Sequence, residues 1–269
     1  MTLSAPIFFA RRPCLPAPAG EETKMSADAI RCLPLALGPG LSGGFFDRQG
    51  GVSPPPYDSL NVGLGVGDEP GRVAENRRRL KAALGLTVLV SARQVHGDRI
   101  LCLSSPVATD AEHDGYDALI TDQPGLGLMI QQADCQAVVI FEPVRRVVAN
   151  VHVGWRGSVA GIIAAVVRRL REEFGAEAAR MRAAISPSLG PCCAEFIHYQ
   201  YTLPAVFHPY QSRPAHFDFW AISRMQLEQA GVPASEVKVA GICTRCGADF
   251  FSYRRQAVTG RAATVAFLP

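Results

Sequence analysis

Residues 147–175 read VVANVHVGWRGSVAGIIAAVVRRLREEFG, an apolar run followed by a short glycine-containing segment and then a longer amphipathic one. The run Val147–Val153 is typical of a buried strand, because it is short, apolar and rich in β-branched residues. Apolar residues recur at helical spacing over Ser158–Phe174 and predict one helix, which Gly175 ends. The stretch therefore predicts a strand that passes through His152–Gly157 directly into a helix.

Outward from this stretch, short runs typical of strands outnumber the helical patterns and do not alternate strictly with them. The other strand-like runs are Leu86–Ser91, Ile100–Leu103, Ala118–Thr121, Leu126–Ile130, Ala137–Phe141, Arg182–Ser186, Val237–Gly241 and Thr264–Leu268. Two further helices are predicted, one from Pro70 to Leu84 and one over about Trp220–Ala230. The excess of strands predicts an α+β fold, with mixed β-sheets packed together and flanking helices, rather than a doubly wound parallel sheet.

No internal repeat or interdomain linker divides the chain. Residues 1–24 are apolar first and basic afterwards, the reverse of a secretory signal, and their prolines discourage a continuous helix. We expect residues 1–24 to be a disordered N-terminal extension and residues 25–269 to form a single catalytic domain. Gly43–Gly67 is dense in Gly, Pro, Ser and Asn, which predicts a long ordered loop region.

The amino-acid composition limits the kinds of partner and compartment that we expect for the protein. The net charge of +3 over 269 residues is too small to indicate nucleic acid or an anionic membrane surface. No apolar run approaches the roughly 20 residues that cross a bilayer. Without a secretory signal, the eight cysteines are expected to be reduced thiols in a cytoplasmic protein. We infer no obligate protein partner.

Three segments place a metal-capable side chain at the edge of a predicted strand. They carry His96, Cys135 and His152. Two imidazoles and one thiolate suit Zn²⁺, and three protein ligands leave the fourth tetrahedral position open, as in catalytic zinc sites. The separations along the chain are long, so a packing or surface role for each residue is the alternative.

The segment after His152 adds a candidate anion site. A helix that begins near Gly157 would present free N–H groups, and Arg156 would add a bidentate donor for phosphate or carboxylate. The alternative is that Trp155 and Arg156 only pack and cap. The arginines near the C-terminus, in 250–261, offer a second anion site, although a solvated turn is the default there.

The remaining cysteine pairs give weaker signals. Cys243 and Cys246 form one CxxC, and a structural zinc would need two more ligands at suitable spacing, which the neighbouring sequence does not offer. Cys192 and Cys193 are adjacent, so their side chains should diverge. We expect packing rather than a disulfide or redox role for either pair.

Taken together, these motifs resemble the YfiH/PgeF family, also called laccase-domain or multicopper polyphenol oxidase proteins. They are, in order, RQGGVS (48–53), YDSLNVG (57–63), QVHG (94–97), ADC (133–135), HVGWRG (152–157), PSLGP (187–191), CTRC (243–246), FFSYRR (250–255) and TGR (259–261). The resemblance covers about Leu41 to Leu268. The chain departs from the family pattern at Asp47, at 186–188 and at Gln256, none of which is a proposed ligand.

The resemblance implies a fold similar to the catalytic domain of cytotoxic necrotizing factor, with zinc bound by His96, Cys135 and His152. It also implies purine nucleoside phosphorylase activity on adenosine, inosine and guanosine, with adenosine deaminase and methylthioadenosine phosphorylase activities in the same site. The copper oxidase name fits the sequence poorly. Multicopper oxidases need many histidines, largely as His-x-His pairs, whereas this chain has six histidines and no such pair.

In this hypothesis the zinc activates the oxygen that attacks, with phosphate attacking the ribose C1′ or water attacking the purine C6. Cys135, His152, His96 and Asp134 are the candidate catalytic residues, and Asp134 is expected to point away from Cys135 in an ideal strand. The candidate contacts to phosphate and nucleoside are Arg48, Ser53, Asn61 and Arg156, and Trp155 or Phe45 is a candidate to stack on the base.

Two other functions stay open at this point. In a metal-free cysteine hydrolase, Cys135 would be the nucleophile and His152 or His96 the base. That reading also has family support, because some relatives are linked to editing of peptidoglycan precursors. A non-catalytic, nucleotide-responsive binding protein would keep the fold and lose the site, but all three proposed ligands are present here.

Overall fold

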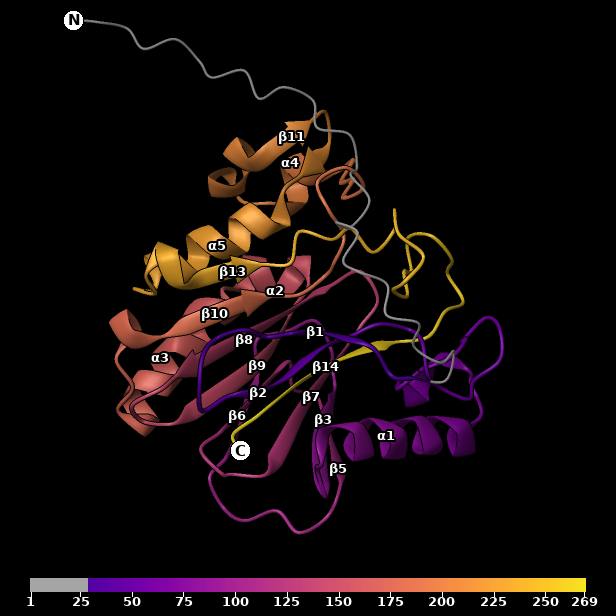
Figure 1. The fold of residues 1–269 in the computed structure, drawn as a ribbon. Coiled ribbons are helices and arrows are strands. Elements are labelled where there is room, and N and C mark those ends of the chain that lie inside the picture. Colours follow the sequence, from indigo (N-terminus) through magenta and orange to yellow (C-terminus); the bar gives the residue numbers. More distant parts are fainter. Residues whose placement is uncertain (1–28) are drawn as a thin grey trace, which may run out of the picture.

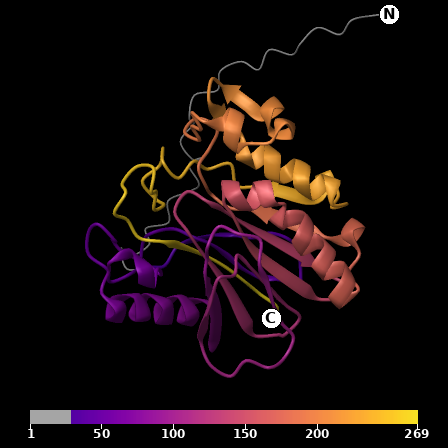
Figure 2. The ribbon, with the colours of Figure 1, turned by 180° about the vertical axis from the view of Figure 1, so that it is seen from behind.

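The protein is described here from a computed structural model of residues 29–269, in which two six-stranded sheets pack face to face (Figure 1 and Figure 2). The disorder expected for residues 1–24 lies outside the described residues. The mixed sheets and flanking helices confirm the predicted α+β class. No helix in 29–269 is long and apolar enough to span a membrane.

The first sheet has the strand order β1-β2-β14-β7-β3-β5. Its strands are β1 (Cys32–Pro34), β2 (Ser42–Phe46), β3 (Val88–Arg93), β5 (Ala111–Asp114), β7 (Leu126–Gln132) and β14 (Ala262–Phe267). Neighbours from β1 to β7 are antiparallel, whereas β3 is parallel to both β5 and β7. The last strand of the chain therefore lies in the middle of this sheet.

The second sheet has the order β13-β10-β8-β9-β6-β4. Its strands are β4 (Ile100–Leu103), β6 (Ala118–Thr121), β8 (Gln136–Glu142), β9 (Val147–Val153), β10 (Arg182–Ile185) and β13 (Val237–Val239). The four central strands are antiparallel to one another, and the edge strands β13 and β4 pair in parallel with β10 and β6. β8 and β9 form its centre.

The central strands are apolar throughout because both of their faces are covered. Alternate side chains of a strand point to opposite faces. In β8, Ile140 packs towards the helices and Phe141 packs between the two sheets. Leu128 of β7 and Ala266 of β14 meet Phe141 from the other sheet. The core between the sheets therefore fixes the ends of β7, β8 and β9 relative to one another.

Helices cover the outer faces of both sheets (Figure 1). The α-helices are α1 (Pro70–Leu84), α2 (Trp155–Ala160), α3 (Ile162–Phe174), α4 (Tyr199–Thr202) and α5 (Phe219–Gln229), and the 3₁₀ helices are Leu64–Val66, Ala178–Arg180, Ala205–Tyr210 and Ala234–Glu236. Leu80 of α1 packs on the first sheet, whereas Ile163 of α3 and Leu227 of α5 pack on the second.

The predicted single helix over Ser158–Phe174 is wrong in one respect. It is divided into α2 and α3 at Gly161, which has φ 78° and is both the C-cap of α2 and the N-cap of α3. Left-handed backbone of this kind ends helices and favours glycine. The apolar stripe continues across the break, so periodicity alone predicts one helix.

Three strands of the first sheet were not predicted from the sequence, and neither were β11 (Gln211–Arg213) and β12 (His216–Phe217), which form a separate two-stranded sheet. β2 occupies the start of the loop region expected at Gly43–Gly67, and β1 and β5 are short and carry polar or exposed residues. Each of these three strands pairs at or near the edge of the first sheet. Their pairing rather than their own pattern makes them strands, because β-propensity depends strongly on neighbouring strands.

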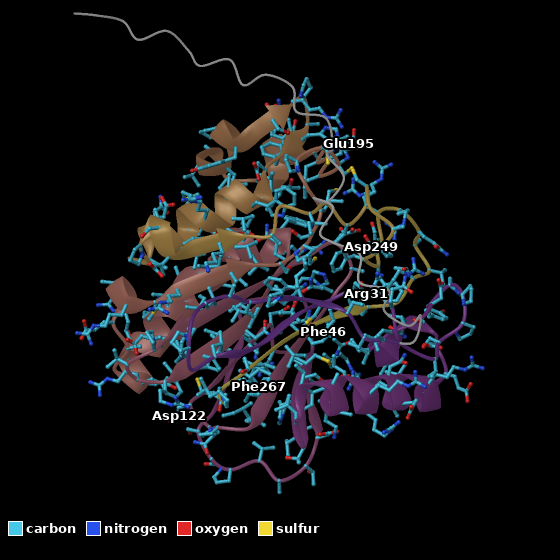
Figure 3. All side chains as sticks on the ribbon, in the orientation of Figure 1. Arg31, Phe46, Asp122, Glu195, Asp249 and Phe267 are labelled. Carbon is cyan, nitrogen blue, oxygen red and sulfur yellow. The ribbon has the colours of Figure 1, made fainter. Side chains whose placement is uncertain are left out.

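Ion pairs of Arg31 connect the start of the described chain to the loop that contains Asp249. Arg31 forms an ion pair with Asp47 at 3.0 Å and lies 3.8 Å from Asp249. Figure 3 shows Arg31 and Asp249 together, above Phe46 and Phe267 of the first sheet. These contacts place the segment that follows β13 beside the N-terminal strands, although the two are more than 200 residues apart.

Candidate active site

His96, Cys135 and His152 come from three different elements and meet at one point. Their ligand atoms all lie within 4.8 Å of one another. His152 is in β9, and Cys135 directly precedes β8, the antiparallel neighbour in which Ala137 pairs with His152. His96 follows β3 in the other sheet. The packing of the two sheets therefore brings the third residue to the first two.

The turns that carry His96 and Cys135 have unusual backbone conformations. His96 has φ 62°, and Asp134, next to Cys135, has φ 88°. Left-handed conformations at residues other than glycine cost free energy and persist where the surroundings enforce them. For the His96 turn, Gln94 supplies one restraint, because its side-chain amide donates to the Gln131 carbonyl and accepts from the Gln131 N–H.

Asp117, which sequence analysis missed, organises two of the three residues. Its buried carboxylate lies 2.7 Å from Nδ1 of His152. The same carboxylate accepts the backbone N–H groups of Val95, His96 and Gly97 at 3.2, 2.9 and 2.8 Å. Asp117 therefore fixes the His152 ring, with Nε2 left for the site, and also fixes the turn that presents His96. The only feature of the sequence that could have indicated this role is that Asp117 is an acidic residue directly before the apolar strand Ala118–Thr121.

Gly154 leaves the space between the three side chains open. A Cβ atom at this position would lie 3.1 Å from Cδ2 of His96 and 3.2 Å from Sγ of Cys135. Nine in ten real contacts of a Cβ atom are wider than 3.4 Å. A side chain here would crowd both residues, so the glycine is needed for their close approach.

The electrostatics of the site favour a thiolate. Burial alone would raise the pKa of Cys135, but His152 and His96 beside it lower that pKa to about 6. Burial would likewise lower the pKa of His152, but Cys135 and Asp117 raise it to about 9. The pKa of Asp117 is lowered despite burial, because His152 and backbone N–H groups stabilise its carboxylate. A thiolate next to imidazoles can bind a soft metal ion or act as a nucleophile.

The three residues open into a cavity of about 790 Å³, a size typical of sites for small molecules. Its wall combines aromatic rings, polar side chains and arginines. Its lining residues include Glu112, Trp155, Phe196, Tyr253, Arg254 and Arg261. The cavity is thus large enough for a nucleoside and carries both apolar and cationic surface.

Three of the expected substrate contacts have their side chains engaged elsewhere. Arg48 forms an ion pair with Asp58 at 2.7 Å and stacks on Phe251. Ser53 and Asn61 are buried and both donate to Asp68, at 2.6 and 2.8 Å. None of the three lines the cavity around Cys135. They hold the loop together instead, which differs from the sequence expectation.

The expectation for the helix after His152 also needs correction. Arg156 is exposed and lies over the Trp155 ring at 4.7 Å rather than lining the cavity. The helix that begins there, α2, has only six residues. The partial charge at a helix N-terminus sums over aligned peptide dipoles, so this short helix is a weak anion site. Trp155 does line the cavity, whereas Phe45 is buried in the core between the sheets.

Asp134 lies in the cavity wall, but its side chain is also engaged. One carboxylate oxygen accepts the Thr244 hydroxyl at 2.7 Å, and the other accepts the Arg254 N–H at 2.6 Å. Its carbonyl accepts the Leu189 N–H at 2.8 Å. Asp134 thus fastens two rim segments to the turn that carries Cys135.

Three arginines line the cavity, of which Arg93 forms an ion pair with Asp114 at 3.2 Å. Arg254 is exposed at the rim, and its guanidinium donates to the Glu195 carbonyl. Arg261 is half-buried, and burial lowers its pKa. Its Nη1 donates to the Thr259 and Gly260 carbonyls, both at 3.1 Å, and a bound anion would further stabilise the half-buried charge. The C-terminal arginines, for which a solvated turn was the default, are therefore the better placed candidates to hold phosphate.

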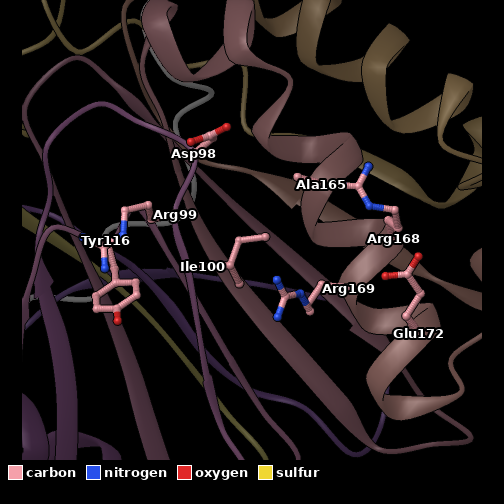
Figure 4. A pocket seen from close by; sticks show the side chains of 8 residues that line it. All are labelled: Asp98, Arg99, Ile100, Tyr116, Ala165, Arg168, Arg169 and Glu172. Carbon is pink, nitrogen blue, oxygen red and sulfur yellow. The ribbon is translucent and has the colours of Figure 1, made fainter.

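A second cavity of about 400 Å³ lies against α3. Figure 4 shows the charged side chains that line it, among them Asp98, Arg168 and Glu172. None of His96, Cys135 and His152 lines this cavity. It is lined mainly by charged side chains, so we place the chemistry in the larger cavity.

Comparison with known proteins agrees with this geometry. The model of the family described as multi-copper polyphenol oxidoreductase laccase matches residues 42–269. The chain belongs to this family. Its solved members include the Bacillus licheniformis protein YfiH, which superposes with a TM-score of 0.80 at 30% identity and covers 85% of this chain and 93% of its own. YlmD from Geobacillus stearothermophilus superposes with a TM-score of 0.79 at 32% identity, covering 87% and 93%.

Relatives in the YfiH family carry an enzyme name. A Streptomyces coelicolor protein named purine nucleoside phosphorylase is 38% identical over 233 residues, which is 84% of this chain and 94% of the relative. The family description names copper, whereas the sequence has six histidines and no His-x-His pair.

Proposed function

We propose that the chain is a zinc-dependent purine nucleoside phosphorylase that acts on adenosine, inosine and guanosine. The observation that carries the proposal is the convergence of His96, Cys135 and His152 on a cavity of about 790 Å³. Relatives named purine nucleoside phosphorylase support the same reaction. Deamination of adenosine and phosphorolysis of methylthioadenosine are proposed as further reactions of this cavity.

The donor set fits zinc. One thiolate and two imidazoles are common zinc ligands, and three protein ligands leave a position open. The space that Gly154 leaves free lies between the donors. When bound, the ion would supply Lewis acid stabilisation of negative charge on an attacking oxygen. The thiolate is already favoured at Cys135 by the two histidines.

Protein side chains would orient the metal ligand His152 and bind the base and the phosphate. Asp117 holds Nδ1 of His152 and thereby keeps Nε2 directed at the site. Trp155 and Phe196, whose rings are 6.3 Å apart, offer apolar faces for a purine base. Arg261, with Arg254 at the rim, would hold the phosphate so that an oxygen reaches C1′ of the ribose.

The proposed bond changes are simple to state. In phosphorolysis, an oxygen of hydrogen phosphate bonds to C1′, the bond from C1′ to N9 of the purine breaks, and the proton of the hydrogen phosphate ends on the departing base. In deamination, water adds to C6 of adenosine and ammonia leaves. The first reaction needs phosphate and the second does not, which separates them experimentally.

The test is product chromatography with zinc-loaded protein and adenosine, with and without phosphate. We expect adenine and ribose 1-phosphate only when phosphate is present, and inosine in both conditions if deamination also occurs. Cys135→Ala should slow both reactions by about 1,000-fold, while Cys32→Ala, a cysteine of β1 outside the cavity, serves as the matched control. A native, zinc-loaded protein that makes no product from adenosine, inosine or guanosine would refute the proposal.

A metal-free cysteine hydrolase that edits peptidoglycan precursors is the second candidate, and a specific observation favours it. Cys135, His152 and Asp117 form a chain of thiol, imidazole and carboxylate of the kind used for nucleophilic catalysis. Alkylation of the thiol separates the two candidates. A metal ligand should react with iodoacetamide only after chelation, whereas a nucleophile should react at once and lose activity on muropeptide precursors.

A further inference from the structure

Two pairs of cysteines that lie far apart in the sequence gather at a second point. Cys192 and Cys193 are in the turn that follows Pro191, and Cys243 and Cys246 are in the CTRC turn after β13. Their sulfur atoms all lie within 4.8 Å of one another. The sequence had suggested side chains that diverge and only pack, so this cluster corrects that expectation.

The distances suit a tetrahedral metal site. Zn–S bonds of about 2.3 Å place the sulfur atoms of a tetrahedron about 3.8 Å apart. In the protein, the Sγ atoms of Cys192 and Cys193 each lie 3.5 Å from Sγ of Cys246. A disulfide would join Cys246 to only one partner at about 2.0 Å. One sulfur atom close to two others is what a shared metal ion requires.

The surroundings of the cluster favour thiolates. The Gly190 N–H donates to Sγ of Cys243 at 3.3 Å, and the Arg245 guanidinium donates to Sγ of Cys193 at 3.6 Å. Donors of this kind around sulfur stabilise thiolate ligands of a metal.

The backbone is shaped for this close approach. A Cβ atom at Gly190 would lie 3.0 Å from Cβ of Cys243 and 3.4 Å from Sγ of Cys192. Two backbone bonds also join the turns, from Ser188 N to Ile242 O at 3.1 Å and from Thr244 N to Ser188 O at 3.0 Å. The two turns are therefore aligned by backbone pairing directly beside the four sulfur atoms.

We propose that Cys192, Cys193, Cys243 and Cys246 bind one structural Zn²⁺ ion. Four thiolates close the coordination sphere, which is typical of structural rather than catalytic zinc. The ion would crosslink two segments that form the rim of the larger cavity. One contributes Phe196 to the wall, and the other reaches Tyr253 and bonds through Thr244 to Asp134.

The decisive measurement uses the variant Cys135→Ala, in which the three-residue site has lost its thiolate. The protein is produced with zinc, purified under reducing conditions and analysed by inductively coupled plasma mass spectrometry. We expect one Zn²⁺ per chain to remain. Replacement by Co²⁺ should give the intense sulfur-to-cobalt charge-transfer absorption of tetrathiolate coordination. Absence of zinc, or cobalt spectra without thiolate bands, would overturn the proposal.

A second pair of variants locates the ion. Cys243→Ser with Cys246→Ser in the otherwise native chain should lower the zinc content by one ion per chain. The matched control is Cys32→Ser with Cys102→Ser, two cysteines outside the cluster, which should retain the native zinc content. Unchanged zinc in the cluster variant would contradict the proposal. So would a native disulfide of Cys246, detected by mass spectrometry of alkylated protein.

These measurements do not depend on the nucleoside reaction. The proposed enzyme fails if native, zinc-loaded protein lacks turnover, whatever the cysteine cluster binds. The proposed structural ion fails if Cys135→Ala holds no zinc, whatever the native protein turns over. Metal content and cobalt spectra therefore test the cluster even if one of its own variants does not fold.

Discussion

Two groups of metal-capable side chains differ in what surrounds them. His96, Cys135 and His152 lie at the ends of strands and open into a cavity, whereas the four cysteines of the second group lie on two turns joined by backbone bonds. The first group has three donors and an open side. The second has four donors of one kind, which can close around an ion. Donor number and access together distinguish a site suited to chemistry from one suited to crosslinking.

The two groups are also oriented by different means. In the first, the buried carboxylate of Asp117 fixes a ring and a turn at once. In the second, backbone N–H groups and Arg245 face the sulfur atoms. A carboxylate behind an imidazole increases its basicity, while N–H groups behind a thiolate spread its charge. The variants below test whether these differences separate activity from stability.

The largest effects are expected for Cys135→Ala and Cys243→Ser, the first on catalytic efficiency and the second on the free energy of unfolding. Loss of the Cys135 thiolate should lower kcat/KM for nucleoside phosphorolysis by about 1,000-fold, because a Lewis acid contributes several kcal/mol, while the unfolding temperature changes little. Cys243→Ser should lower the unfolding free energy by about 3 kcal/mol, or roughly 6–12 °C. Initial rates and calorimetry check both. If the two variants changed kcat/KM and the unfolding free energy equally, the two groups would not differ as a catalytic site and a structural site.

Asp117→Asn should give the next largest effect. The amide keeps the shape of the side chain but loses the charge that favours His152 as a metal ligand, so zinc affinity and activity should fall about 10- to 100-fold. Competition with a coloured chelator measures the affinity. Asp122→Asn is the matched control, since this exposed residue ends the same segment four positions after Ala118. An unchanged zinc affinity would contradict the role of Asp117.

Gly154→Ala should have a smaller effect that is confined to the site. The added methyl group would crowd His96 and Cys135 by a few tenths of an ångström, beyond the tolerance of about 0.2 Å for metal ligands. We expect zinc affinity to fall about 10-fold with an unfolding temperature near that of the native protein. Gly71→Ala in α1, whose nearest neighbour is 3.8 Å away, is the control. Native affinity in Gly154→Ala would show that this space is not part of the site.

The smallest effect is expected at Glu112, whose carboxylate lies 2.6 Å from Arg77 and also bonds Ser91 and Gln131. Burial raises its pKa, but these partners lower it overall. The stabilisation is therefore present above the unfolded pKa of about 4.3 and disappears as pH falls through the folded value. Glu112→Gln should cost about 1–2 kcal/mol at pH 7 and less at pH 3, by urea unfolding. Glu69→Gln is the control, because this exposed carboxylate pairs with Arg72 on the surface and its loss should change the unfolding free energy at pH 7 by less.

Much of the local structure was predictable from sequence. Ile100–Leu103, Ala118–Thr121 and Val147–Val153 are strands with the predicted bounds, because their apolar runs carry a local signal. The three residues named as ligands do meet in space. Their roles as ligands stay a proposal. The substrate contacts were harder to predict than the strands. Ser53 and Asn61 are ordinary polar residues, and the sequence does not indicate that they are buried against Asp68.

The sequence by itself determined most of the strands and helices, and it determined which side chains carry thiol, imidazole and guanidinium chemistry. Only the tertiary structure decided that Asp117 stands behind His152, that Arg261 faces the cavity, and that two cysteine turns join. The physical reason is the separation along the chain of the residues that interact. Strand and helix patterns arise within a few residues, whereas these contacts join positions 35 or more apart and depend on the order of strands and the packing of two sheets.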